Sequence, residues 1–171
     1  MKENNQPWAI YKMYSLDPEK FDINEFDSHL AATFLYKSFE IGQPVLTEII
    51  SSGKLSIIQN DQIRFKIIGW GALLEKAQKE DEFAYRYLES IFMYSLDYVS
   101  WRNSDKFDPD MIKYDQGNRR LKPDNRSALS SFPLENRIGQ FLWYIDNVQT
   151  EYTNLLRHIE EISMLLESEI E

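Results

Sequence analysis

Apolar residues near the C-terminus recur at alternating spacings of four and three, and this pattern constrains the fold more than any other. Such spacing places the residues on one stripe of an α-helix, as in coiled coils and helical bundles. Pro133 precedes the stripe, where its missing N–H suits the first turn of a helix. The sequence therefore predicts one helix from about Leu134 to Ile170. Its heptad-patterned face would comprise Leu134, Ile138, Phe141, Ile145, Val148, Tyr152, Leu155, Ile159, Ile162 and Leu166.

A second helical pattern spans about residues 61–101. Helical spacing relates Ile63, Ile67, Trp70, Leu74 and Ala77, and later Tyr87, Ile91, Tyr94 and Tyr98. The polar run at residues 79–82 is either a turn or an exposed stretch of one helix. Because the chain has no strand–helix–strand alternation, we expect an all-α fold, an elongated helical bundle with a long C-terminal helix.

The pattern predicts one helical domain over residues 1–171. It divides into short helices or irregular structure at 1–44, central helices at 45–101, a long polar loop at 102–131 and the long helix at 132–171. Loops of this length are uncommon within compact domains and often carry function. A short helical turn within the loop is compatible with its sequence.

Composition and charge exclude several classes of function. The chain has 171 residues, of which 43% are hydrophobic, too many for a disordered chain. Its net charge of −9 is opposite in sign to the surface that nucleic acids and anionic lipids attract. No apolar run approaches the roughly 20 residues that span a bilayer. We therefore expect no nucleic-acid partner and no direct membrane insertion by this chain.

The segment SGK at residues 52–54 invites comparison with a phosphate-binding loop. That loop requires glycine five residues before the second glycine, and serine or threonine after the lysine. Glu48 and Leu55 occupy these two positions, so both requirements fail.

The same segment is better explained as a junction between two helices. Gly53 can adopt the left-handed conformation that ends a helix over residues 45–51. Asn60 or Asp61 would then cap the next helix. The apolar residues of the connector, which we expect to attach it to the core, are Leu55, Ile57 and Ile58.

The text LTEIISSGKLSIIQNDQIRFKIIGW, residues 46–70, and the final helix together resemble an uncharacterised bacterial family, a domain of unknown function. Its members have one membrane-spanning helix and a helical domain outside the inner membrane. The resemblance implies that this chain is the soluble part of a membrane-tethered envelope protein, on the periplasmic side. Since the chain lacks the spanning helix, a cytoplasmic location is the alternative. The family motif implies structural roles for Gly53, Leu55, Ile58, Asn60 and Arg64.

The sequence contains no motif that is typical of a metal site or a catalytic site. His29 and His158 each share a predicted helix face with a carboxylate, Glu25 and Glu161, but zinc needs three or four convergent ligands. A calcium loop from Asp108 would have lysine and arginine where glycine and glutamate are required. The chain has no cysteine and no nucleophile-elbow motif. We expect no cofactor, no bound metal and no enzymatic activity.

Two groups of residues are candidates for binding. A basic cluster in the polar loop either meets an acidic partner or phosphate, or pairs with nearby acids in solvent; it comprises Arg119, Arg120, Lys122 and Arg126. An aromatic group either packs in the core or lines a pocket or interface; it comprises Tyr87, Tyr94, Tyr98, Trp101 and Trp143.

These observations favour a non-enzymatic helical interaction or structural module. The heptad-patterned helix predicts self-association or a protein partner. The alternative is a ligand-binding sensory domain with an aromatic-lined pocket between helices.

Overall fold

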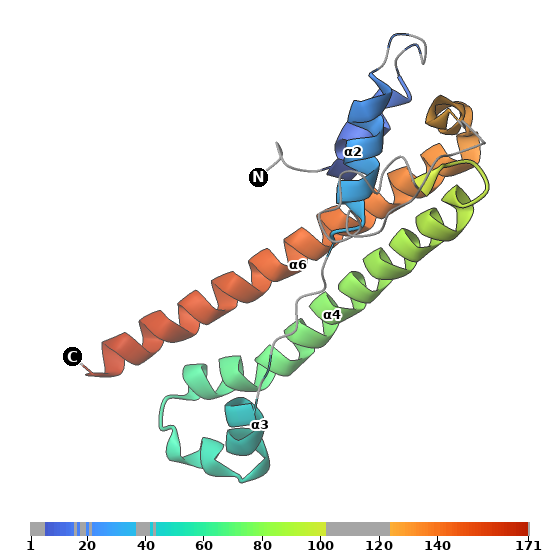
Figure 1. Cartoon of the computed structure of the whole chain (residues 1–171). Coiled ribbons are helices and arrows are strands. Elements are labelled where there is room, and N and C mark those ends of the chain that lie inside the picture. Colours follow the sequence, from blue (N-terminus) through green and yellow to red (C-terminus); the bar gives the residue numbers. More distant parts are fainter. Residues whose placement is uncertain are drawn as a thin grey trace, which may run out of the picture. The chain divides into compact units, whose positions relative to one another are not determined.

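The computed structural model describes residues 6–15, 17, 20, 22–36, 42, 44–101 and 124–170. All regular elements in these ranges are helical, so the predicted all-α bundle with a long C-terminal helix is confirmed (Figure 1). None of the described helices combines the length and the apolar character needed to cross a membrane. The elements are α1 (Gln6–Met13), α2 (Ile23–Thr33), α3 (Pro44–Ser51), the 3₁₀-helix η2 (Lys54–Ile57), α4 (Asp61–Ser95), the 3₁₀-helix η5 (Asn125–Ser130) and α6 (Phe132–Ile170).

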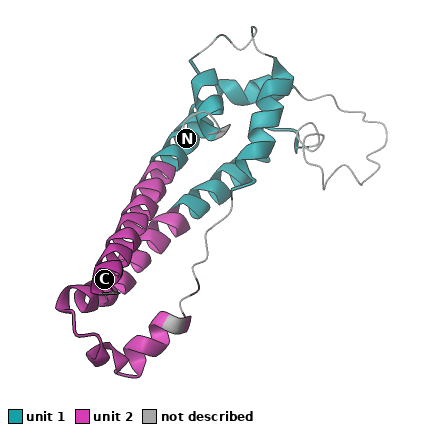
Figure 2. Ribbon diagram, turned by 90° about the vertical axis from the view of Figure 1, so that its left-hand side faces the viewer, with its two compact units in different colours: residues 1–37, 84–143 teal, residues 38–83, 144–171 magenta. Residues whose placement is uncertain are grey.

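The chain forms two compact units, each built from segments far apart in the sequence (Figure 2). Unit 1 comprises residues 1–37 and 84–143, and unit 2 comprises residues 38–83 and 144–171. The long helices α4 and α6 each contribute residues to both units.

Helix α4 continues through the polar run at 79–82 and buries a regular line of residues. The line has the four-and-three spacing of a heptad; it comprises Trp70, Leu74, Ala77, Asp81, Ala84, Leu88, Ile91 and Ser95. The predicted spacing is confirmed up to Ala77. Beyond it, Ile91 is buried as predicted and Tyr87 and Tyr94 are half-buried, whereas Tyr98 lies after the end of α4 and is exposed, so the prediction for Tyr98 is wrong.

In unit 2, the N-terminal part of α4 packs against the C-terminal part of α6. Trp70, Leu74, Ala77 and Leu155 form a buried cluster, which Leu46 of α3 also contacts. Polar contacts flank the cluster and fix the helix pair: Lys76 to Glu151 at 2.8 Å, and Asn147 to Glu80 at 3.3 Å.

In unit 1, α1 and α2 cover the other ends of the same two helices. The largest fully buried side chains there are Phe26 and Leu30 of α2, Ile10 of α1, Ile91 of α4, and Leu134, Ile138 and Phe141 of α6. Tyr11 of α1 lies close to Gly139 of α6, where an added Cβ would come within 3.3 Å of the Tyr11 ring. Glycine at this position therefore permits the approach of α1.

A buried polar network joins three segments of unit 1. The Asn125 side chain is fully buried in η5. Its Oδ1 accepts a hydrogen bond from the Ser100 N–H at 2.7 Å, and its Nδ2 donates to Ser100 O at 3.3 Å. Nδ2 also donates to Oδ1 of Asp27, on α2, at 2.6 Å. The short helical turn that is compatible with the end of the polar segment thus exists, and its first residue connects η5 to α2; residues 102–123 of the predicted loop lie outside the described residues.

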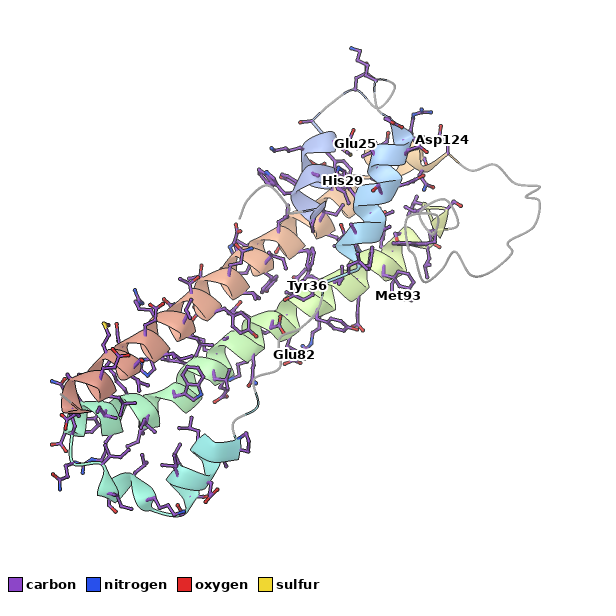
Figure 3. The ribbon with its side chains drawn as sticks, turned by 60° about the vertical axis from the view of Figure 1, so that its left-hand side comes forward. Glu25, His29, Tyr36, Glu82, Met93 and Asp124 are labelled. Carbon is purple, nitrogen blue, oxygen red and sulfur yellow. The ribbon has the colours of Figure 1, made fainter. Side chains whose placement is uncertain are left out.

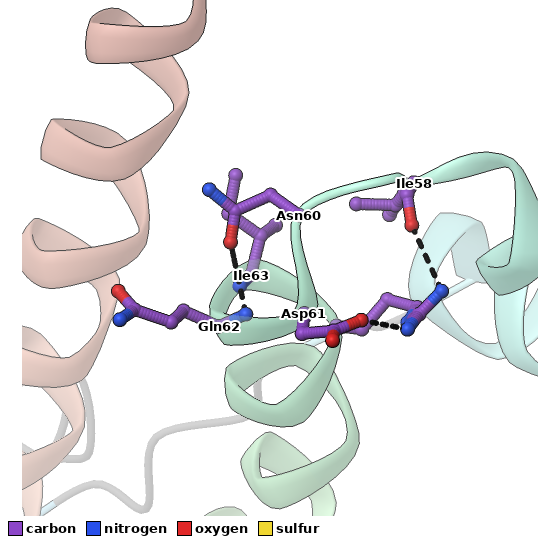
Figure 4. A network of polar contacts seen from close by, with 6 residues as sticks. Ile58, Asn60, Asp61, Gln62 and Ile63 are labelled. Carbon is purple, nitrogen blue, oxygen red and sulfur yellow. Dashed lines mark hydrogen bonds and ion pairs between the residues drawn. The ribbon is translucent and has the colours of Figure 1, made fainter.

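The junction between α3 and α4 has the conformation that the sequence predicted (Figure 4). Gly53 has φ of 72°, a left-handed conformation, directly after α3. Oδ1 of Asn60 accepts hydrogen bonds from the backbone N–H groups of Gln62 and Ile63, at 2.9 and 3.3 Å, and so caps α4. Arg64 donates to Ile58 O at 3.3 Å, which ties the connector to the helix.

The connector is attached to the protein by fewer apolar side chains than we expected. Leu55 and Ile58 are half-buried, but Ile57 is 75% exposed, so the expectation for Ile57 is wrong. Because a 3₁₀-helix has three residues per turn, Leu55 and Ile58 lie on the same side of the turn and Ile57 lies on a different side.

The heptad face of α6 holds as far as Leu155 and then changes. Leu134, Ile138, Phe141, Ile145, Val148 and Leu155 are buried as predicted, and Tyr152 is half-buried. After Leu155 the half-buried positions are His158, Glu161, Ile162 and Leu165, whereas Ile159 and Leu166 are exposed. Ile162 thus keeps its predicted place, whereas His158 and Leu165 take the places predicted for Ile159 and Leu166, so that a three-residue step follows Leu155 instead of the predicted four-residue step.

Three contacts with α4 accompany this change. The Nε2–H of His158 donates to Lys66 O at 2.8 Å, and its ring stacks on Trp70 with centroids 6.3 Å apart. Lys66 also pairs with Glu161. The side of α6 that faces α4 therefore runs through His158 and Glu161, and not through Ile159.

Candidate functional site

Three residues of the predicted basic cluster, Arg119, Arg120 and Lys122, lie outside the described residues. Arg126 lies in η5, and its Nη1 donates to Oδ2 of Asp124 at 2.9 Å. At this residue the structure has the local acid–base pair that the sequence offered as one alternative.

The described contacts distribute the five residues of the predicted aromatic group over several places, and a pocket shared by all five stays a prediction. Tyr94 and Tyr98 stack on each other with centroids 4.9 Å apart, and Trp101 packs elsewhere, against Phe34 at 4.8 Å. Tyr87 lines a shallow surface depression beside Phe132 and Arg137, and Trp143 is mostly exposed. Tyr87 and Tyr94 are one heptad apart on α4, whereas Tyr98 and Trp101 lie after the end of α4 at Ser95, where helical spacing no longer applies.

A different set of aromatic side chains forms a groove in unit 1. The groove has a volume of about 320 Å³. Its described lining residues, which we call the aromatic groove, are Phe34, Tyr36, Tyr85, Leu88, Glu89 and Phe92. The last four lie on one face of α4, at a spacing that the sequence displays. The first two follow α2, and no local pattern relates them to α4.

A second surface results from the change of packed face on α6. Leu156, Ile159 and Leu166 are 58%, 47% and 45% exposed, and with the exposed Ser163 they have steps of three, four and three. We call these four residues the C-terminal stripe. Their spacing is that of a helix that packs against a further helix.

Glutamates border one edge of the C-terminal stripe. Glu160 and Glu167 are exposed and each directly follows an apolar residue of the stripe, so they lie beside it on the helix surface. Glu161 does not belong to this border, because it forms an ion pair with Lys66 of α4. The hydrogen bond from Lys66 and its positive charge hold the pKa of the Glu161 carboxyl below its usual range. The border is therefore two solvent-facing carboxylates at heptad spacing.

Neither histidine belongs to a metal site in the part of the chain that is described. His29 and Glu25 lie together on α2, as the spacing predicted, with 3.6 Å between Nε2 and Oε1 (Figure 3). His158 is hydrogen-bonded to a backbone carbonyl. Within the described residues, no three His, Cys, Asp or Glu side chains are placed to hold an ion together.

Comparison with known proteins yields no match among the family models, the curated proteins or the solved structures. The candidate surfaces of this chain are therefore the C-terminal stripe in unit 2 and the aromatic groove in unit 1.

Proposed function

We propose that the protein is a non-enzymatic helical interaction module that binds an amphipathic helix of a partner protein on its C-terminal stripe. The observation that carries this proposal is the exposure of Leu156, Ile159 and Leu166 on a helix whose opposite side is packed. An amphipathic helix recognises such a surface through apolar residues at the same three-and-four spacing.

The border of the stripe specifies the charge of the partner. In a helix pair, the residues that flank the apolar seam lie opposite the flanking residues of the partner. Glu160 and Glu167 occupy this flanking position, so a partner with lysine or arginine there gains attraction. A second copy of this chain would instead bring glutamates to glutamates. Self-association through the stripe is therefore the less favourable arrangement.

Matched peptides test this proposal. Two amphipathic helical peptides would share the same apolar residues and carry either lysine or glutamate at the flanking positions. We expect the basic peptide to bind roughly tenfold more tightly at low salt. Its two lysines attract Glu160 and Glu167, whereas the two glutamates of the other peptide repel them. The preference should shrink in 0.5 M NaCl, a concentration at which the screening length falls to only ~4 Å. Fluorescence anisotropy of labelled peptides measures both affinities.

A pair of variants locates the binding surface. Because about half of each side chain is already shielded, burying the rest of Leu156 and Ile159 contributes ~1 kcal/mol each, and the double variant L156Q/I159Q should bind roughly 30-fold more weakly. The matched control is F65Q/I68Q on α4 of the same unit, where the side chains are 72% and 56% exposed and lie outside the stripe. If both double variants lose the same affinity for the peptide, the C-terminal stripe is not the binding surface. If mass photometry shows that a second copy of the chain binds, self-association is the function of the stripe in place of a partner helix.

We also propose that the module acts on the periplasmic side of a bacterial inner membrane, tethered to it. The support is the resemblance of residues 46–70 to the membrane-tethered family. Protease treatment of spheroplasts from the native bacterium tests the location. Cleavage of the protein in intact spheroplasts agrees with it, and cleavage only after lysis opposes it.

A ligand-binding sensory domain is the second candidate function. It is favoured by the aromatic groove, whose volume of about 320 Å³ lies at the lower end of the range for small-molecule sites. The two functions use different surfaces in different units, so the variants of one surface leave the other intact.

A further inference from the structure

We infer that the aromatic groove of unit 1 is a binding site for an organic ammonium ion, with a trimethylammonium or similar alkylammonium group as the recognised part. The inference is independent of the C-terminal stripe and remains if that proposal fails. Four aromatic rings, a leucine and one carboxylate line the groove within the described residues.

The chemistry of the lining selects a cation. The faces of aromatic rings carry negative electrostatic potential and attract ammonium groups. Glu89 is the one charged side chain among the described lining residues, and it is exposed at the groove. Because no lysine, arginine or histidine belongs to this described lining, an anionic ligand would find no charged partner there. The net charge of −9 further favours the approach of cations.

The rings of the groove are held by further rings. Phe34 and Phe92 contact each other edge to face at 5.7 Å, and both contact Trp101, at 4.8 and 5.3 Å. Tyr36 packs edge to face on the buried Phe141, with centroids 5.9 Å apart. Trp101 is itself fixed, since its Nε1–H donates to Oγ of Ser95 at 3.1 Å. Rings that are fixed before binding lose little freedom when the ligand arrives.

The apolar lining of the groove suits an alkylammonium head. The lining joins the buried Leu88 to rings that remain partly exposed, with Tyr85 at 46% and Phe92 at 40%. Methyl groups on nitrogen bring apolar surface to these side chains while the positive charge remains. A bare inorganic cation would lack the apolar contact and would keep its hydration shell.

A cation and its neutral isostere test the inference directly. Choline and 3,3-dimethylbutan-1-ol have the same shape and differ in charge. Titrating each into the full chain, with the methyl resonances followed by NMR, should give a choline affinity about tenfold higher. Equal affinities would show an apolar groove without charge recognition and would overturn the inference. No binding of choline at about 50 mM, roughly the weak limit for a ligand of a few atoms, would also overturn it.

Two variants assign the binding to the groove. Glu89→Gln should weaken choline binding about threefold, as expected for an exposed charge pair. Its matched control, Glu82→Gln, removes the same charge one heptad earlier on α4, outside the groove, and should change nothing (Figure 3). Tyr85→Leu keeps an apolar wall but removes its π face, and it should weaken choline without weakening the alcohol. Circular dichroism confirms that each variant is folded. Equal effects of the variants at positions 82 and 89 would show attraction to overall charge and refute a site.

Discussion

We predict that Asn125→Ala destabilises unit 1 more than any surface substitution of similar size. The side chain is fully buried and makes three hydrogen bonds that connect η5, the segment after α4, and α2. Alanine leaves the backbone N–H and C=O of Ser100 without these bonds, and it removes a partner from the Asp27 carboxylate.

The magnitude follows from the groups left behind. Each buried polar group that loses its partner costs ~1–3 kcal/mol, and a charged one costs more. The void left by the amide adds roughly 1 kcal/mol. Water that enters this polar void, and the further interaction that Asp27 makes, offset part of the loss. We therefore expect a decrease of about 4 kcal/mol in the free energy of unfolding.

Urea denaturation followed by circular dichroism measures this decrease. The matched control is Asn24→Ala on α2, where the side chain is exposed and donates to the exposed Asp22; its effect should stay within about 0.5 kcal/mol. A double-mutant cycle between Asn125 and Asp27 should show coupling above ~1 kcal/mol. A loss below about 1 kcal/mol for Asn125→Ala, with no coupling, would refute the role of the network.

Three further predictions concern other positions. Gly53→Ala should lower stability by about 1 kcal/mol in thermal denaturation, since alanine is strained at φ of 72°; an unchanged midpoint would contradict this. Asn60→Ala should cost about 1 kcal/mol by loss of the α4 cap, whereas Asn60→Asp should largely retain it. Burial raises the pKa of the Tyr14 hydroxyl above its ordinary value of 10.0. The folded state therefore favours the neutral hydroxyl, and the stability that Tyr14 contributes is complete below pH 10 and is lost as the pH rises further. Tyr14→Phe should reduce this alkaline loss in urea titrations, and an unchanged pH profile would oppose the assignment.

The sequence was sufficient where neighbouring residues determine the structure. The left-handed Gly53 and the cap of α4 depend on residues within a few positions of one another; Gly53 was predicted correctly, and the cap was predicted at Asn60 or Asp61, of which Asn60 is the one observed. The long helix α6 was predictable because its apolar pattern is continuous, with a start within two residues of the observed Phe132.

Contacts between distant segments could not be predicted in this way. Asn125 and Asp27 are 98 positions apart, and nothing in either segment marks them as partners. The aromatic groove likewise needs residues after α2 beside α4. On α6, Ile159 and His158 are both compatible with a helical stripe. His158 takes the packed position because it contacts Trp70 and Lys66 on α4.

The central claim is that the C-terminal stripe recognises a helix with basic flanks. Its most direct test is the ratio of the dissociation constants of the glutamate-flanked and lysine-flanked peptides, measured at low salt on the unaltered chain. The structure predicts a ratio of roughly ten, because Glu160 and Glu167 border the apolar residues. A ratio near one, or no binding of either peptide, would contradict the claim.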